Sequence, residues 1–346
     1  NALKGRNAVI VAPSPKGWAT SARLLEHIHA EFDRIGAPRD LVQLLPAPIS
    51  KAATYALMAA CDLVVATGSQ ANVRAAYASG TPAFGVGAGN VAGIVDETAD
   101  LALAAERILR SKTFDNATSC SSENSLVLLD AVRAAAIAAL QAQGAVLLTA
   151  AQKKALQAVM WPDGKLSAAV IGQNATVVAQ RAGLLDVAAL KPRILLVEEE
   201  GVGDDYPFSG EKLCPVLTLY GAADFDAAIA LVERIYTHQG AGHSVGLHSA
   251  LPARALRLGL ELPVSRVIVD QAHCIATGGS FDNGLPFSLS MGCGTWGKNN
   301  FSDNMNYRHY LNITRISRPI AERMPTEEAI FGSYFAKFGR ACLWLN

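Results

Sequence analysis

A single thiol, Cys120, ends the short polar run FDNATSC at residues 114–120. The run follows a helix-like stretch and precedes an apolar one. Cysteine is often buried as ordinary core filler, so a lone cysteine is not by itself a nucleophile. Nucleophilic catalysis by a thiol also requires a base, hydrogen-bond donors for an oxyanion and an acceptor for the acyl group. The chemistry of Cys120 therefore depends on what the rest of the chain supplies.

The other cysteines are scattered without a Cys-x-x-Cys pair or a histidine spacing typical of zinc sites. They are Cys61, Cys214, Cys274, Cys293 and Cys342. In a chain of 346 residues this distribution favours reduced thiols in a cytoplasm over a disulfide framework. We expect all of them to be core or surface residues, and only for Cys293, in a Gly-rich loop, does a role near the site stay open.

The composition is that of a folded α/β protein with room for two domains. Hydrophobic residues make up 51% of the chain, charged residues 17%, and the formal net charge is zero. No basic run indicates a nucleic-acid partner. The most apolar window, residues 126–148, contains Asp130, Arg133 and two glutamines, so it predicts a buried strand and a helix, and no membrane span. No signal peptide is recognised, and we expect a cytoplasmic protein.

Strands and helices alternate over the first hundred residues. Strands are predicted at 7–13, 40–46, 61–68 and 81–87, and helices at 20–38, 51–60 and 71–80. The first helix has Thr20 or Ser21 near its start and Gly36 at its end. Alternation with nearly continuous apolar strands predicts a parallel sheet covered on both faces.

The strand at 61–68 ends in Gly68, Ser69 and Gln70 ahead of a helix. In a parallel α/β sheet a nucleotide binds at such a carboxyl end. No complete GxGxxG motif is present, and a glycine after a strand is more often part of a turn. We expect a partial dinucleotide-binding domain over residues 1–97.

A second α/β region follows, with a helix at 98–112 that leads to Cys120. Strands are predicted at 124–130, 167–173, 193–200, 215–224, 243–249 and 266–272, with helices through Ala139 and at 225–240 and 254–263. The loop at 276–300 is too long and too rich in Gly and Asn to be a simple turn, and such loops are usually functional. We expect a catalytic domain over 98–300, then a strand near 309–320 and a final helix around 327–339 within 301–346.

Five motifs, in the same order along the chain, resemble the CoA-acylating branch of the aldehyde dehydrogenase superfamily. They are TGSQANVRAAYASGTPAFGVGAGNVAGIVDETAD (67–100), SKTFDNATSCSSENSLVL (111–128), SGEKLCPVL (209–217), GAGHSVGLHS (240–249) and LSMGCGTWGKNNFSDNMNYRHYLNITRISRPI (289–320). The branch includes the aldehyde half of aldehyde–alcohol dehydrogenases and the acylating succinate-semialdehyde and sulfoacetaldehyde dehydrogenases. The resemblance implies an α/β fold with a Rossmann-type cofactor domain, a catalytic domain bearing the cysteine, and a short strand that builds a homodimer or homotetramer.

Members of this family carry a further hundred-odd residues ahead of the point where this chain begins. That segment completes the cofactor domain and holds a catalytic asparagine in an NPT motif. We therefore expect this chain to be a fragment or a processed product, or to lack its first portion in this sequence, and we expect little activity from these 346 residues alone.

The resemblance implies that Cys120 is the nucleophile. Its thiolate would add to an aldehyde carbon, and the backbone N–H of Cys120 would be one donor to the resulting oxyanion. Hydride would leave for a nicotinamide, and a thioester would remain on the sulfur. His243 matches a family histidine that could assist deprotonation of coenzyme A, and the alternative is a merely hydrogen-bonded histidine. Glu123 is a weaker acid–base candidate.

Hydrolytic aldehyde dehydrogenases activate water with a glutamate in an ELGG stretch. The equivalent stretch here is GVGAGN at 85–90, where Val86 stands at about the glutamate position. No side chain there takes a proton from water, so the thioester should survive until the thiol of coenzyme A attacks it. The alternative interpretation is a plain Gly-rich turn after a strand.

The resemblance also assigns the nicotinamide cofactor. Glu211 matches a glutamate that holds the nicotinamide ribose hydroxyls, whereas the alternative is an exposed residue at a strand start. Gly68 and Ser69 would lie under the pyrophosphate, and Gly87 is a further cofactor-binding candidate.

The adenosine ribose would lie at VAPSPKG, residues 11–17, which contains no carboxylate for a 2′-hydroxyl. Ser14 and Lys16 of this stretch could instead receive a 2′-phosphate. This slightly favours NADP, and NAD stays open.

The favoured function is reversible oxidation of a small aldehyde to its acyl-CoA with reduction of NADP or NAD. The alternatives are a hydrolytic aldehyde dehydrogenase, disfavoured by Val86, and an inactive fragment or scaffold subunit. The C-terminal motif resembles the sulfoacetaldehyde and succinate-semialdehyde types more than the acetaldehyde enzymes, and an anionic substrate needs cations or donors in the pocket. Candidates for that role are Lys112, Lys298, Arg308, Asn116 and Asn283. No metal site and no nucleic-acid or membrane partner is predicted.

Overall fold

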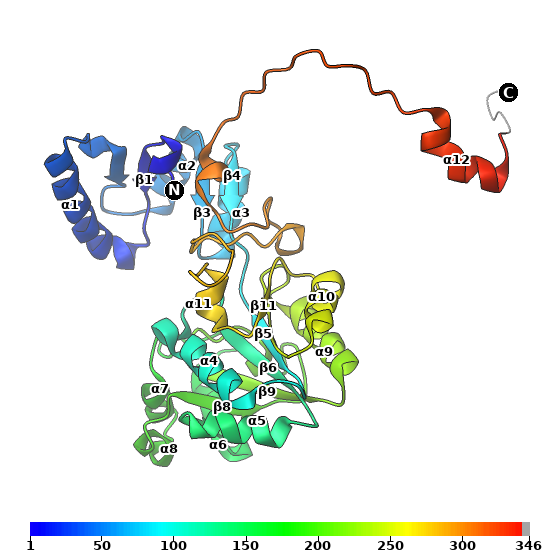
Figure 1. Cartoon of the computed structure of the whole chain (residues 1–346). Helices are drawn as coiled ribbons and strands as arrows, with labels where there is room; N and C mark the ends of the chain where they lie inside the picture. The colour runs from blue at the N-terminus through cyan, green and yellow to red at the C-terminus, as the bar shows by residue number, and fades with distance from the viewer. Residues whose placement is uncertain (341–346) are drawn as a thin grey trace. The chain divides into compact units, whose positions relative to one another are not determined.

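The structure is a computed structural model that describes residues 1–340. It divides into two units, Asn1–Tyr310 and the residues from Leu311 onward (Figure 1). Over residues 311–340 the smaller unit begins as extended chain and contains one helix, α12 (Glu327–Phe338). All the residues predicted to form the active site belong to the larger unit.

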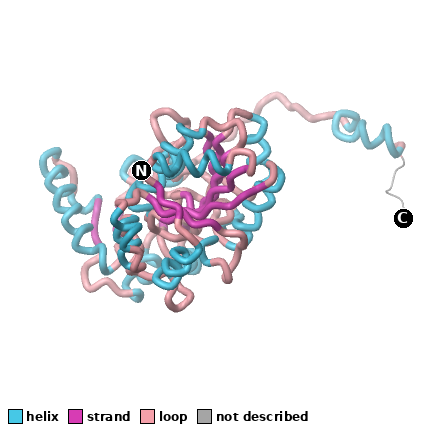
Figure 2. The backbone as a smooth tube through the Cα atoms, turned by 90° about the horizontal axis from the view of Figure 1, so that it is seen from below, coloured by secondary structure: helices cyan, strands magenta, loops and turns pink. Residues whose placement is uncertain are grey.

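A seven-stranded, fully parallel sheet forms the centre of the larger unit (Figure 2). Its strand order is β11-β10-β5-β6-β9-β8-β7. The strands are β5 (Val91–Val95), β6 (Glu123–Leu129), β7 (Ala145–Leu147), β8 (Ile194–Glu198), β9 (Val216–Ala222), β10 (Val245–His248) and β11 (Val267–Val269). The predicted parallel α/β fold is confirmed.

Helices cover both faces of this sheet, because successive side chains of a strand point to opposite sides. Along β6, Val127 and Leu129 pack with α9 (Phe225–His238) and α10 (Pro252–Glu261). Leu126 and Leu128 pack with α4 (Leu101–Thr113) and α5 (Arg133–Ala142) on the other face. The other helices of this region are α6 (Ala150–Met160), α7 (Ala175–Arg181), α8 (Leu185–Ala189) and α11 (His273–Thr277). The sheet is thus a buried frame that fixes the loops at both of its edges.

Residues 1–90 form two further parallel strand pairs. The strands are β1 (Val9–Val11) with β2 (Val42–Leu44), and β3 (Val64–Ala66) with β4 (Ala83–Gly85). The helices are α1 (Trp18–Ile35), α2 (Lys51–Ala60) and α3 (Gln70–Ala78). The predicted alternation is confirmed, but β2 and β3 do not pair, so the strands form two pairs and not one sheet. β5 already belongs to the large sheet, while the predicted domain boundaries at 97 and 300 stay predictions.

One predicted strand is wrong. Residues 167–173 form turns, in which Ser167 N–H donates to the carbonyl of Met160 and Gly172 has φ +70°. The strand expected near 309–320 would pair with a second subunit, so it stays a prediction; within the single chain a 3-10 turn, Tyr307–Tyr310, is followed by residues without strand structure. A strand needs a neighbour to share its backbone hydrogen bonds, and no described strand of this chain pairs with that segment.

The start of α1 also differs from the prediction. A 3-10 turn at Pro15–Gly17 leads directly into the helix, which begins at Trp18 and not at Thr20 or Ser21. Gly36 ends the helix in the left-handed conformation at φ +69°, as predicted.

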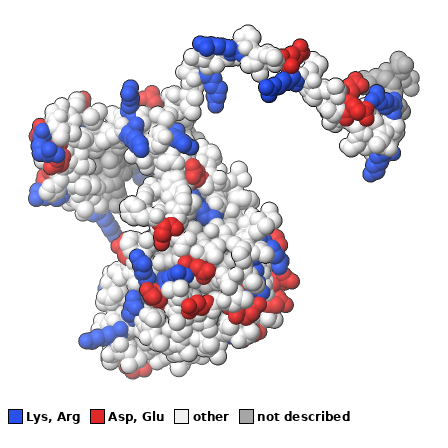
Figure 3. Space-filling model, in the orientation of Figure 1, with Lys and Arg blue, Asp and Glu red and all other residues white. Residues whose placement is uncertain are grey.

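None of the helices within residues 1–340 is long and apolar enough to cross a membrane. On the visible face of the larger unit, basic and acidic side chains are interspersed (Figure 3). This distribution agrees with the formal net charge of zero.

Candidate active site

Three of the predicted site residues lie at the amino edge of the large sheet. Cys120 comes shortly before β6, Glu211 before β9 and His243 before β10. Because the strands are parallel, their amino ends meet at one edge. Residues far apart in the sequence are therefore gathered around the start of β6.

Cys120 and His243 are in direct contact. The Sγ atom of Cys120 lies 3.3 Å from Nε2 of His243, whose Nδ1 lies 2.7 Å from Oγ of Ser244. Burial, and secondly the charge of Arg266, lower the pKa of His243 to about 3. Burial, and secondly the carboxylate of Glu211, raise the pKa of Cys120 to about 12. The resting pair is therefore a thiol beside a neutral imidazole.

A strained turn presents Cys120. Asp115, Asn116 and Ala117 all have positive φ, at 48°, 48° and 59°. The Nδ2 of Asn116 donates to the carbonyl of Gly172 at 3.0 Å, and Thr118 Oγ1 donates to the side chain of Asp115 at 2.8 Å. Non-glycine residues in this conformation cost free energy and are concentrated at functional sites.

The Gly-rich stretch at 85–90 packs against the nucleophile. A Cβ atom on Gly89 would lie 2.1 Å from the carbonyl oxygen of Cys120, and one on Gly87 would lie 2.9 Å from Sγ of Cys293. Val86 is 6% exposed, and its N–H donates to the carbonyl of Ala66 at 3.1 Å. The stretch is thus more than a turn after a strand, because it forms a wall of the cysteine site.

Glu211 is half-buried beside two lysines. Burial raises the pKa of Glu211 to about 7, while the charges of Lys112 and Lys212 oppose that shift. The backbone N–H of Glu211 donates to Oε1 of Gln239 at 3.1 Å. Nζ of Lys212 donates to the carbonyls of Phe208 and Gly210 at 2.6 and 2.9 Å. The carboxylate is therefore held on an anchored loop near Cys120.

Residues 1–158 match the model of the aldehyde dehydrogenase family. Over 340 residues the chain is 66% identical to the sulfoacetaldehyde dehydrogenase (acylating) of Cupriavidus necator, covering 98% of this chain and 69% of that protein. It also superposes on an acetylating aldehyde dehydrogenase from Geobacillus thermoglucosidasius with a TM-score of 0.87 at 34% identity, over 94% of this chain and 72% of that one. This chain belongs to the CoA-acylating aldehyde dehydrogenase family.

A third neighbour of this acylating dehydrogenase is a propionaldehyde dehydrogenase from Rhodopseudomonas palustris, solved with bound propionyl-CoA. The TM-score is 0.76 at 26% identity, over 86% of this chain and 64% of that one. The predicted family and enzyme class are confirmed.

Glu123 and Lys112 are buried charges of this dehydrogenase behind the cysteine. Ser111 Oγ donates to Oε2 of Glu123 at 2.5 Å and accepts from the N–H of Cys274 at 2.7 Å. Burial raises the pKa of Glu123 to about 7 and lowers that of Lys112 to about 8. Within residues 1–340, Lys112 Nζ and Glu123 Oε1 have no hydrogen-bond partner. Lys112 is therefore an internal charge of the site, which its sequence context did not reveal.

The residues predicted to bind the far end of the cofactor lie at other strand ends. Ser14 Oγ accepts from the N–H of Gly17 at 3.2 Å, in the turn that joins β1 to α1 and also contains Lys16. Ser69 Oγ accepts from the N–H of Asn72 at 3.3 Å and caps α3, directly after Gly68 at φ +93°. A helix N-terminus after a strand fits a pyrophosphate. No hydrogen bond within residues 1–340 joins these positions to Cys120.

The other candidates for binding an anionic substrate are engaged elsewhere or exposed. Asn283 Nδ2 donates to Gln271 Oε1 and the carbonyl of Ala276, at 3.0 and 3.1 Å, and Lys298 and Arg308 are exposed. None of these three residues is placed against Cys120, and neither is Asn116, whose amide donates to the carbonyl of Gly172.

The sequence analysis missed Arg266, a buried guanidinium. It donates to Asn304 Oδ1 at 2.7 Å, to the carbonyl of Gly292 at 2.9 Å and to that of His243 at 3.4 Å. Arg266 therefore anchors the predicted Gly-rich loop to the histidine. The only signal in the sequence was the length and composition of that loop. No group of three or more His, Cys, Asp or Glu side chains within residues 1–340 is arranged to hold a metal.

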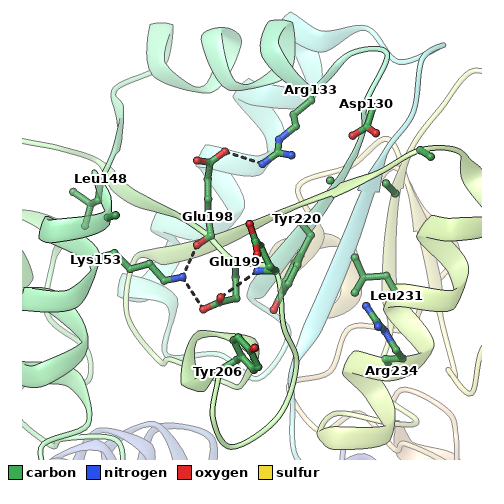
Figure 4. A pocket seen from close by; sticks show the side chains of 15 residues that line it. Asp130, Arg133, Leu148, Lys153, Glu198, Glu199, Tyr206, Tyr220, Leu231 and Arg234 are labelled. Carbon is green, nitrogen blue, oxygen red and sulfur yellow. Dashed lines mark hydrogen bonds and ion pairs between the residues drawn. The ribbon is translucent and has the colours of Figure 1, made fainter.

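A cavity of about 660 Å³ lies at the opposite, carboxyl edge of the sheet (Figure 4). Its charged side chains are largely paired with one another: Arg133 with Glu198, and Lys153 with Glu199, each at 2.8 Å. It contains none of the predicted site residues. The predicted site residues Cys120, Glu211 and His243 are at the amino edge.

Proposed function

We propose that this protein oxidises a small anionic aldehyde to its coenzyme A thioester, with NAD(P) as hydride acceptor. Sulfoacetaldehyde is the proposed preferred substrate. The observation that carries the proposal is the 3.3 Å contact between Cys120 Sγ and Nε2 of a buried, neutral His243. The 66% identity to an enzyme named for sulfoacetaldehyde supports the substrate class.

In the proposed acylation, Cys120 Sγ attacks the aldehyde carbon and its proton passes to Nε2 of His243. An S–C bond forms, and the backbone N–H of Cys120 donates to the oxyanion. When bound, the nicotinamide accepts a hydride. A thioester is left on Cys120, and His243, whose pKa burial lowers to about 3, releases the proton to solvent and becomes neutral again.

In the proposed second half, neutral His243 accepts the proton of the coenzyme A thiol. The coenzyme A sulfur then attacks the thioester carbon, the bond between that carbon and Cys120 Sγ breaks, and His243 returns the proton to the leaving Cys120 sulfur. Val86 lies in the wall of the site and has no group that could deprotonate water. Thiol transfer is therefore favoured over hydrolysis.

The residues at the strand ends fit the cofactor in part. We propose that Glu211 binds the nicotinamide ribose, that Gly68 and Ser69 bind the pyrophosphate, and that Ser14 and Lys16 bind the adenosine end. The Lys16 charge favours NADP over NAD. Gly87, where an added Cβ would lie 2.9 Å from Sγ of Cys293, stays a candidate for cofactor contact.

We also propose a cytoplasmic homodimer or homotetramer. Ile316 and Ile320 of the smaller unit are each 82% exposed, and exposed β-branched residues in an extended segment suit pairing with a second subunit.

The test is an assay, with and without coenzyme A, of the protein purified from the cells that produce it. Without coenzyme A, at most about one NAD(P)H per active site should form, because ping-pong chemistry stops at the acyl-enzyme. Coenzyme A should restore turnover and yield a thioester, and Cys120→Ser should give neither burst nor turnover. Sustained turnover to the free acid would overturn the acylating function.

Substrate class needs a separate comparison. The proposal predicts a higher kcat/KM for sulfoacetaldehyde than for succinate semialdehyde or acetaldehyde. A preference for succinate semialdehyde would keep the reaction and reject the substrate.

A further inference from the structure

A buried asparagine, Asn90, lies where three loops of the site meet. It ends the Gly-rich stretch at 85–90 and directly precedes β5. Its Nδ2 donates to the carbonyl of Ser209 at 2.9 Å and to the carbonyl of Gln239 at 3.2 Å. One amide thus holds two backbone segments that are distant in the sequence.

Each of the three segments carries a different part of the proposed chemistry. The stretch with Asn90 contacts the Cys120 carbonyl through Gly89. The Ser209 segment continues into Glu211, and the Gln239 segment continues into His243. Asn90 therefore connects the supports of the nucleophile, the ribose carboxylate and the base.

Close backbone packing leaves little freedom at this junction. Gly240 has φ +98°, and a Cβ atom there would lie 2.6 Å from Cβ of Asn90. A Cβ atom on Gly210 would lie 2.9 Å from Oε1 of Gln239. The two glycines allow the loops to approach Asn90 and Gln239 directly.

Gln239 extends the connection to the carboxylate itself. Its carbonyl accepts from Asn90, while its side-chain Oε1 accepts from the backbone N–H of Glu211 at 3.1 Å. The main chain of Gln239 is thus bonded to Asn90 in the segment that leads to His243, whereas its side chain is bonded only to the Glu211 loop. A change of the Gln239 side chain therefore tests the support of Glu211 separately from the support of His243.

Asn90 is fully buried, and its Oδ1 has no hydrogen-bond partner within residues 1–340. A buried amide with an unsatisfied oxygen is a poor choice for stability alone. Its two donated hydrogen bonds satisfy the buried carbonyl of Ser209 and the partly buried carbonyl of Gln239. The structural role of Asn90 is therefore carried by the two hydrogen bonds that its amide donates.

We propose that Asn90 is a positioning residue that fixes Glu211 and His243 relative to Cys120, with the Gln239 side chain as a second positioning group for Glu211 alone. The proposal rests on the proposed function, because it assigns these three residues to the reaction.

The test compares Asn90→Asp, Asn90→Ser and Gln239→Met with the control Gln180→Met, which changes an exposed glutamine of α7. Two readouts do not depend on aldehyde or coenzyme A: the Kd for NAD(P), and the rate at which iodoacetamide alkylates Cys120. Steady-state KM and the rate of thioester transfer to coenzyme A complete the set. If wild-type protein makes no acyl-CoA, the proposed function fails while the first two readouts still test Asn90.

Asn90→Asp should weaken NAD(P) binding about tenfold and slow both alkylation and thioester transfer by a similar factor. Asn90→Ser, which keeps one donor and adds no charge, should show smaller losses of both kinds. Gln239→Met should weaken NAD(P) binding several-fold and leave alkylation and thioester transfer unchanged. Gln180→Met should match wild type.

Folded Asn90 variants with wild-type cofactor binding and alkylation would overturn the proposal. So would equal losses in both readouts for Gln239→Met, because its side chain contacts only the Glu211 loop. If Asn90→Asp does not fold, Asn90→Ser and Gln239→Met give the same decision.

Discussion

At the scale of single residues, the Cys120–His243 pair sets the resting state of the proposed site. Both pKa values move in the direction that keeps the proton on sulfur: the thiol is raised to about 12 and the imidazole lowered to about 3. The main cause in both is burial, which disfavours the charged forms. The reactive thiolate is therefore a minor species until a substrate or cofactor changes the site.

This predicts the pH dependence of Cys120 alkylation. Since only the thiolate reacts, the iodoacetamide rate at Cys120 should rise steadily from pH 6 to pH 9 without a plateau. Mass mapping of the modified peptide identifies the cysteine, and Cys120→Ser supplies the background. A plateau near neutral pH would mean that the cysteine is an ion pair with His243.

Glu211 should make cofactor binding weaker at low pH. The proposed ribose contact uses the carboxylate, and its pKa is raised to about 7 by burial against the charges of Lys112 and Lys212. The group is ionised above that pH, so the Kd for NAD(P) should rise as pH falls below about 7. Lys112→Met removes a neighbouring cation and should move the inflection to higher pH.

Glu211→Gln is the reference for that experiment. It should bind NAD(P) several-fold more weakly at pH 8, with little pH dependence, and its circular dichroism should match wild type. Binding that equals wild type at pH 8 with both NAD and NADP would show that Glu211 makes no ribose contact.

The sequence motifs predicted Cys120, Glu211 and His243 as site candidates, and the structure gathers them at one sheet edge. Asn90 and Arg266 were missed because each acts through backbone carbonyls of distant loops. Such partners leave no spacing pattern in the sequence. Lys112 was weighed only as a substrate cation, since its burial is a property of the packed fold.

At the scale of elements, the position of Cys120 depends on a glycine contact between two loops. A Cβ on Gly89 would lie 2.1 Å from the Cys120 carbonyl oxygen, which is backbone that cannot rotate away. Gly89→Ala should therefore displace the start of β6 and lower the acylation rate by about a hundredfold or more. Rapid-mixing measurement of the burst rate tests this.

Gly284→Ala is the matched control, because a Cβ there would meet no atom within 4 Å. It should leave the burst rate unchanged. A normal burst in Gly89→Ala would show that the two loops are not in contact in the working enzyme.

Most strands were predictable because long apolar runs such as residues 124–130 are buried on both faces. β5 was missed, since VAGIV follows a Gly-rich stretch that masks its start, and β7 was missed because it follows the Ala-rich helix α5 within the same apolar window. Residues 167–173 were wrongly predicted as a strand, because only Val170 among their apolar side chains is buried, and it packs into the core from a turn. Ala168 and Ala169 are exposed, so the apolar run marked neither burial nor backbone conformation there.

At the scale of the whole molecule, the larger unit holds every residue assigned to the reaction. The smaller unit has no fully buried residue among 311–340. Its apolar side chains include Ile313, Ile316 and Ile320, exposed at 66%, 82% and 82%. Exposed apolar side chains gathered in this way mark an interaction surface, and a second subunit is the partner that the family resemblance implies.

Removal of residues 311–346 tests this assignment. The seven-stranded sheet and its helices lie wholly within Asn1–Tyr310, so the shortened protein should keep its circular dichroism spectrum. Light scattering should show that it is a monomer, whereas the unshortened protein should be a dimer or tetramer. Ile316→Lys with Ile320→Lys should also give a monomer, because charges on a buried pairing surface are costly, while Lys337→Ala should leave the assembly intact. Persistence of the same oligomer after removal of the segment would place the subunit interface on the larger unit and leave 311–340 without a role in assembly.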